Sequence, residues 1–134
     1  MAGSGTAIGI VNNILNVTPT DVTPPTVTAV TDNVNVAVGN GPITFTVTLS
    51  ETLGATLGMA NFIATHGNVD GVSKIDDTHY TVHVTPNANL ASGDVALSIQ
   101  NLGGVVDLSN NPLANANLAS FDSQAVDTLA PNVL

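Results

Sequence analysis

Apolar and polar side chains alternate one by one along three stretches of this chain. The clearest stretch is Ile43-Thr44-Phe45-Thr46-Val47-Thr48-Leu49, and the same alternation runs from Tyr80 to Thr85 and from Val95 to Gln100. Because successive side chains of a β-strand point to opposite faces, this period of two predicts strands with one buried face. Weaker patterns predict further strands at residues 26–31, 61–65, 69–75 and 118–126.

These stretches predict an all-β fold. Gly, Pro, Asn and Asp separate the predicted strands, and signals that start or stop a helix are nearly absent. Regularly spaced short strands with turn residues between them are typical of two antiparallel sheets packed face to face. The sequence therefore predicts an antiparallel β-sandwich of about seven strands.

The composition limits the classes of partner and of site. The 134 residues contain no cysteine, so disulfides and thiolate metal sites are excluded. Ten acidic side chains face the single Lys74, and the formal net charge is -9. One lysine cannot neutralise a phosphate backbone, so we expect no nucleic-acid binding, and no apolar run is long enough to predict membrane insertion. A surface of this charge attracts cations.

The two ends of the chain suggest a tandem array. The segment Asp21-Val22-Thr23-Pro24-Pro25-Thr26-Val27 recurs loosely as Asp127-Thr128-Leu129-Ala130-Pro131-Asn132-Val133, with Asp, the later Pro and Val in matching places. We interpret residues 21–126 as one repeat and residues 127–134 as the linker into the next. Residues 1–20 are interpreted as an added start, Met1 to Gly5, followed by a linker or the tail of a preceding repeat.

Several short motifs resemble the bacterial immunoglobulin-like repeats of giant, type I-secreted surface adhesins. They occur in order within residues 21–127: Asp21-x-Thr23-x-Pro25, Thr48-Leu49-Ser50-Glu51, Ala60-Asn61-Phe62, Tyr80-Thr81-Val82 and Val106-Asp107-Leu108-Ser109-Asn110-Asn111-Pro112-Leu113. The resemblance implies an immunoglobulin-like sandwich outside the bacterial cell, with neighbouring repeats of the same chain as its partners. It also implies calcium near the domain junction. Asn61 stands where such repeats often carry Asp.

A simple geometric argument places a calcium site. If the strands run up and down in chain order, the connections after the second, fourth and sixth strands return to the end where the first strand begins. Those connections hold Glu51, Asp76 with Asp77, and Asp107, and Asp21 lies at the entry. Crowded carboxylates repel one another, and Ca²⁺ with six to eight oxygen ligands removes that cost. We predict Asp21, Glu51 and Asp107 as ligands, with Asn61 and Asn110 as neutral additions and Asp127 serving the next repeat. The alternative is that these acids are solvated turn formers.

No constellation of catalytic residues emerges from the sequence. It lacks a cysteine nucleophile, a G-x-S-x-G elbow and a phosphate-binding loop, so we do not expect an enzyme. His79 and His83, four positions apart on a predicted strand, would lie about 13 Å apart, too far to share one zinc ion. The leading hypothesis is a structural extender repeat. The alternative is a binding or homophilic adhesion module that recognises a host or neighbouring-cell surface.

Overall fold

The strongest alternating stretch forms the centre of the main sheet. A computed structural model describes residues 20–34 and 41–131 of the chain, and in it β2 spans Ile43–Leu49 as predicted. Its apolar side chains are buried and its threonines are half-buried. β2 pairs with β1 (Val27–Asp32) and β5 (His79–Pro86), and β4 (Gly67–Lys74) completes an antiparallel sheet of order β1-β2-β5-β4.

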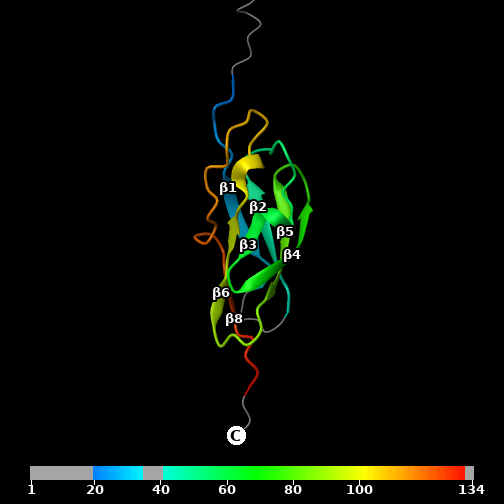
Figure 1. The fold of residues 1–134 in the computed structure, drawn as a ribbon, viewed down its shortest axis with the longest axis vertical. Coiled ribbons are helices and arrows are strands. Elements are labelled where there is room, and N and C mark those ends of the chain that lie inside the picture. Colours follow the sequence, from blue (N-terminus) through cyan, green and yellow to red (C-terminus); the bar gives the residue numbers. More distant parts are fainter. Residues whose placement is uncertain (1–19, 35–40, 132–134) are drawn as a thin grey trace, which may run out of the picture.

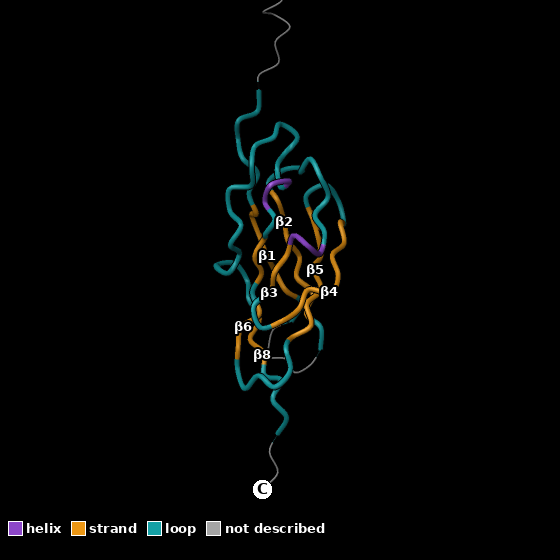
Figure 2. The backbone as a smooth tube through the Cα atoms, viewed as in Figure 1, coloured by secondary structure: helices purple, strands orange, loops and turns teal. Residues whose placement is uncertain are grey.

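Two short strand pairs form the opposite layer (Figure 2). β3 (Phe62–Ala64) pairs with β7 (Leu97–Ile99), and β6 (Gly93–Val95) pairs with β8 (Gln124–Val126). One hydrophobic core joins the layers, since Phe45, Val82, Leu97 and Leu118 belong to the same buried cluster and are fully enclosed. This arrangement confirms the predicted antiparallel β-sandwich.

The predicted strand at residues 95–100 is divided in the structure. Val95 pairs with Gln124 in one strand pair, whereas Leu97 pairs with Ala64 in the other. The chain changes partner at Ala96, so three consecutive residues are buried and the alternation fails there. The prediction of one continuous strand is wrong at this point, because a strand that serves two pairs has no single outward face.

The predicted strand at residues 118–126 is also mostly irregular, and only β8 forms at its end. The segment before β8 follows the outer edge of β1 and bonds to it through side chains. Asn115 accepts the Val27 N–H at 2.8 Å and donates to the Val27 carbonyl at 3.0 Å, and Asp122 accepts the Asp32 N–H at 2.9 Å. These side chains replace a backbone ladder and cover the edge of β1.

The strands are not in up-and-down order, because β2 lies beside β5 and β3 beside β7. If β6 and β7, which follow one another in the same direction, are counted as one run, the strands still alternate in direction. The connections after β2, β4 and β7 therefore begin at the end where residues 20–26 enter. We call this end, with those connections, the N-terminal pole. The opposite end, the C-terminal pole, holds residues 127–131 and the connection 87–92. The chain enters at one pole and leaves at the other (Figure 1).

Two short 3-10 helices, η2 (Met59–Asn61) and η3 (Leu102–Gly104), lie in these connections. Among the described residues, no helix has the length and apolar character needed to cross a membrane.

Candidate metal centre

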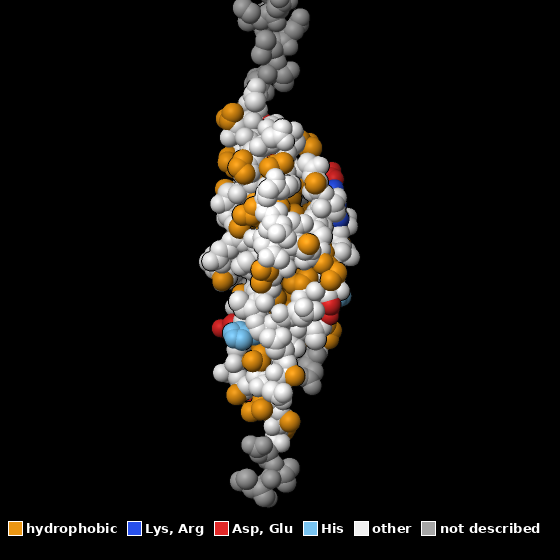
Figure 3. Space-filling model, in the orientation of Figure 1, with side chains coloured by type: hydrophobic (Ala, Val, Ile, Leu, Met, Phe, Trp, Pro, Cys, Tyr) orange, Lys and Arg blue, Asp and Glu red, His pale blue; other side chains and the backbone are white. Residues whose placement is uncertain are grey.

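Charged side chains are sparse on the face drawn in Figure 3, where hydrophobic side chains show at both ends. The acids predicted at the N-terminal pole do lie in its connections. Three of them come together: ligand oxygens of Asp21, Glu51 and Asp107 all lie within 4.8 Å of one another. They come from the entering segment, the connection after β2 and the connection after β7, so the cluster joins three separate parts of the chain.

Asp21 is positioned by its own turn and by the connection after β7. Its Oδ1 accepts the Thr23 N–H at 2.9 Å, which closes a short Asx turn. Its backbone carbonyl accepts a hydrogen bond from Asn111 Nδ2 at 2.9 Å. Pro25 is buried, and its carbonyl accepts the Ala114 N–H at 3.0 Å. The entering segment is therefore fastened to residues 111–114 before β1 begins.

Asp107 is the buried member of the cluster, with only 1% of its surface exposed. Its Oδ1 accepts the backbone N–H groups of Ser109 at 2.7 Å and Asn111 at 2.8 Å, and its Oδ2 accepts Asn111 Nδ2 at 2.8 Å. Burial alone would raise the pKa of Asp107, but these hydrogen bonds to the ionised form outweigh it and lower the pKa. The carboxylate is held charged and in one orientation.

Glu51 completes the cluster from the other side. Its connection is fixed to the Asp107 segment by a β-bridge between Leu53 and Asp107 and by a 2.8 Å hydrogen bond from the Gly54 N–H to the Val106 carbonyl. A Cβ on Gly54 would lie 3.1 Å from the Asp107 carbonyl oxygen, so the two segments are close enough to favour glycine. Burial and the negative charges of Asp21 and Asp107 raise the pKa of Glu51.

This donor set has a clear chemical preference. All three groups are carboxylates, which suit hard cations such as Ca²⁺ and Mg²⁺, and the cluster has no imidazole or thiolate to favour zinc. Burial first, and then the negative charges of Asp21 and Asp107, make the ionised form of Glu51 costly and raise its pKa. A cation bound between them would remove that cost.

The other predicted ligands have different places in the structure. Asn61 Oδ1 accepts the Gly58 N–H at 3.0 Å and its Nδ2 donates to the Gln100 carbonyl at 3.2 Å, so its amide closes η2 instead. Asn110 is exposed, and its left-handed backbone, with φ 67°, shapes the Asp107 loop. Asp127 lies at the opposite pole.

The remaining acids of the N-terminal pole are used locally in the β4–β5 turn. Asp76 accepts the Thr78 N–H at 2.9 Å and contacts His79 Nδ1 at 2.8 Å, and these bonds lower its pKa. Asp77 forms an ion pair with Lys74 at 3.4 Å. The position of these acids at the pole was predicted correctly, but they stay outside the cluster.

Sequence reasoning missed two organising residues. Asn111 binds both Asp21 and Asp107, and the only signal for it was its place four residues after Asp107 in the motif. Thr128 carries the second feature, at the C-terminal pole. This buried residue donates its hydroxyl to the Asn87 carbonyl at 2.6 Å and accepts the Leu90 N–H at 2.9 Å.

The backbone around Thr128 strengthens that attachment. The N–H groups of Thr128 and Leu129 both donate to the Leu90 carbonyl at 2.8 Å. Leu129 N–H also lies 3.2 Å from Asp127 Oδ1, so Asp127 forms the same i to i+2 turn as Asp21. We refer to residues 127–129 bound to the connection 87–90 as the Thr128 latch.

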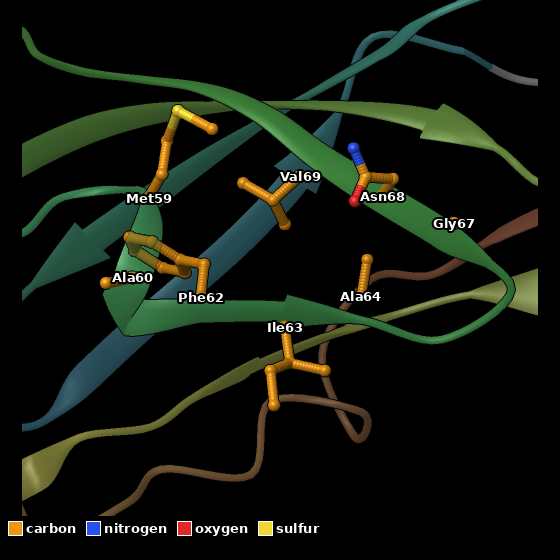
Figure 4. Close-up of a pocket in the computed structure, with 8 residues that line it drawn as sticks. All are labelled: Met59, Ala60, Phe62, Ile63, Ala64, Gly67, Asn68 and Val69. Atoms are coloured by element: carbon orange, nitrogen blue, oxygen red, sulfur yellow. The ribbon is translucent and has the colours of Figure 1, made fainter.

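A shallow groove, lined mainly by hydrophobic residues but also by Asn68 and polar backbone, lies between β3 and β4 on the side of the sandwich (Figure 4). It has a volume of about 380 Å³. Val69 lies on β4 above β3, whereas Ile63 points away from Val69 on the other side of β3. Two of its lining residues, Met59 and Ile63, are 51% and 46% exposed. The groove carries no charged lining residue, and its residues are Met59, Ala60, Phe62, Ile63, Ala64, Gly67, Asn68 and Val69.

Comparison with known proteins supports the immunoglobulin-like character of this sandwich. The family model of the bacterial Ig-like domain matches residues 21–127. Neither a curated protein nor a solved structure matches the chain significantly.

Proposed function

The chain belongs to the bacterial Ig-like domain family, and from that premise we propose that it is an extender repeat of a large bacterial cell-surface adhesin. Domains of this family are in general surface or extracellular modules. Two observations support the extender role. The chain enters and leaves at opposite poles, so repeats joined end to end would extend along one line (Figure 1). The entry segment at Asp21 also recurs at Asp127, as expected for a tandem array.

The second part of the proposal is that calcium stiffens the junction between repeats. The observation that carries it is the convergence of Asp21, Glu51 and Asp107 within 4.8 Å. Asp21 belongs to the entering segment, so a cation held by all three would tie that segment to two connections of the domain. Three carboxylates are too few for the usual calcium shell, and water and carbonyl oxygens would complete it. Asp127 would serve the next repeat as Asp21 serves this one.

A calcium titration followed by thermal unfolding tests this proposal. An ion that binds only the folded chain must stabilise it, by about 2.7 kcal/mol at a free concentration of 100 times Kd. We expect saturable binding and a higher Tm in the chain, and neither in Asp107→Ala. Asp77→Ala removes an exposed acid at the same pole and should keep the response. An unchanged melting curve with saturating calcium would leave the sandwich intact but remove the metal from the proposal.

The groove between β3 and β4 favours a second candidate function, a ligand-binding or homophilic adhesion module. Its exposed Met59 and Ile63 offer apolar contact area, and β4 forms an edge of the main sheet. Homophilic adhesion predicts concentration-dependent dimerisation, which sedimentation of the chain would detect. Met59→Lys should then abolish the dimer, because a charge beside the groove opposes burial.

A further inference from the structure

The junction segment Asp127-Thr128-Leu129-Ala130-Pro131 is bonded to the repeat that precedes it. The Thr128 latch fixes Thr128 and Leu129 to Asn87 and Leu90 of the same repeat. Thr128 is 9% exposed, so its side chain is part of that repeat's packed structure.

The corresponding segment, Asp21-Val22-Thr23-Pro24-Pro25, is bonded to the repeat that follows it. The Asp21 carbonyl accepts from Asn111, and the Pro25 carbonyl accepts from Ala114. Val22, the counterpart of Thr128, is 76% exposed and has no such attachment on the side of the following repeat.

In a tandem chain one segment would carry both sets of bonds. The first residue (Asp127, matching Asp21) and the fifth (Pro131, matching Pro25) would be fixed to the following repeat. The second and third, Thr128 and Leu129, would be fixed to the preceding one. Leu129 and Pro131 are separated by Ala130 alone, and two residues of extended chain span at most about 7 Å. With both sets of bonds formed, the segment has no slack and the two poles meet.

The exposed apolar side chains lie where such a contact would form. Of the seven large hydrophobic side chains exposed among the described residues, three lie in the connections after β4 and β7 at the N-terminal pole, and Leu129 lies at the C-terminal pole. A polar surface would be expected at an end that always faces water. The three are Leu108 (75% exposed), Ile75 (61%) and Leu102 (42%); Val22 is left out because Thr128 takes its place at a junction.

We propose that the N-terminal pole of each repeat docks directly on the C-terminal pole of the repeat before it, with Leu108 and its apolar neighbours in the contact. This inference rests on the tandem array of the proposed function, but it does not need the metal. The contact follows from the interleaved anchors and the apolar surface, so it should persist when calcium is removed.

The test uses a two-repeat chain in which residues 1–131 continue into residues 26–134 of a second copy, so that Asp127 to Pro131 forms the junction. The protein has no cysteine, so one introduced thiol reports on one position. Leu108→Cys in the second copy should react with a thiol reagent roughly tenfold more slowly than Leu108→Cys in the first copy, whose pole is free. The same ratio is expected in calcium and in chelator. Ile75→Cys provides a second probe of the same pole.

Two controls make the result specific. Ile63→Cys, on β3 between the poles, should react equally in both copies. A Gly-Ser-Gly-Ser insertion after Ala130 restores slack and should bring the second Leu108→Cys to the rate of the first.

Equal rates without the insertion would overturn the docking, and protection that disappears in chelator would show that the metal makes the contact. Failure of the calcium proposal gives a different result, namely no calcium binding with the protection intact.

Discussion

At the N-terminal pole three carboxylates from three segments lie within 4.8 Å, whereas at the C-terminal pole one buried hydroxyl, Thr128, joins two segments by neutral hydrogen bonds. Both poles fasten a terminal segment to the sandwich. The hydroxyl needs no further partner, because its donor and acceptor functions are both used. Hydrogen bonds from Ser109 and Asn111 satisfy Asp107, but burial and the charges of Asp21 and Asp107 raise the pKa of Glu51. The attachment at Thr128 is complete in the free chain, whereas the acidic cluster keeps a repulsion that the proposed cation would relieve.

The largest expected effect comes from removing the buried carboxylate. Asp107→Ala leaves the N–H groups of Ser109 and Asn111 without their acceptor, and we expect Tm in chelator to fall by roughly 10 °C. The pKa of Asp107 is lowered by folding, so its contribution is present at neutral pH and is lost as the pH falls through the acid range. Thermal unfolding against pH should therefore show less acid destabilisation in the variant. Equal acid sensitivity of both chains would contradict this account.

The next-largest effect shows whether the stability contributed at the C-terminal pole is independent of calcium. Thr128→Val is nearly isosteric but leaves the Asn87 carbonyl and the Leu90 N–H without their hydroxyl partner, which should destabilise the chain by about 1.5 kcal/mol. The loss should be the same in calcium and in chelator. Denaturant unfolding measures it, and Thr128→Ser, which keeps the hydroxyl, should recover most of the stability. A calcium-dependent loss would mean that the two poles are coupled.

A smaller effect, of opposite sign, is expected at Glu51. Its folded pKa is raised, so its ionised form costs stability at neutral pH, and this cost disappears as the pH falls through the raised pKa. Glu51→Gln should raise Tm in chelator by about 2 °C at pH 7, with the gain shrinking at acid pH. The same variant should weaken calcium binding in the titration. A variant that is less stable in chelator would show that Glu51 is not repelled by its neighbours.

The smallest effect tests a predicted ligand. Asn110 has a left-handed backbone, which glycine adopts readily, so Asn110→Gly should change stability by no more than about 0.5 kcal/mol. If its side-chain carbonyl also binds calcium, as the sequence predicted, the variant will show a weaker affinity in the titration. An unchanged affinity would restrict Asn110 to shaping the loop.

Sequence reasoning succeeded where one physical rule acts alone. β2 alternates because one face is buried and the other is not, and its bounds followed directly. The rule failed at Ala96, where the chain changes partner, and before β8, where Asn115 and Asp122 side chains replace a ladder. Neither event produces a periodic pattern of apolar and polar residues in the sequence.

The sequence also predicted part of the candidate site, namely the end of the sandwich where its acids lie. Alternating strand direction brings the connections of Glu51 and Asp107 to the end where Asp21 enters, whatever the order of strands in the sheet. The amide of Asn61 could not be placed, because its direction depends on its bonds to Gly58 and Gln100. The Thr128 latch was missed because a threonine after the last strand has no distinctive spacing.

The opposite positions of entry and exit also decide how the repeat carries tension. A pull on the two ends acts along β1 and β8. Because the ladder bonds of each strand lie across that direction, they are loaded in shear and resist together. β1 has five paired positions with β2, whereas β8 has three with β6. Under force the β8 side should therefore yield first, and the Thr128 latch is the attachment that delays it.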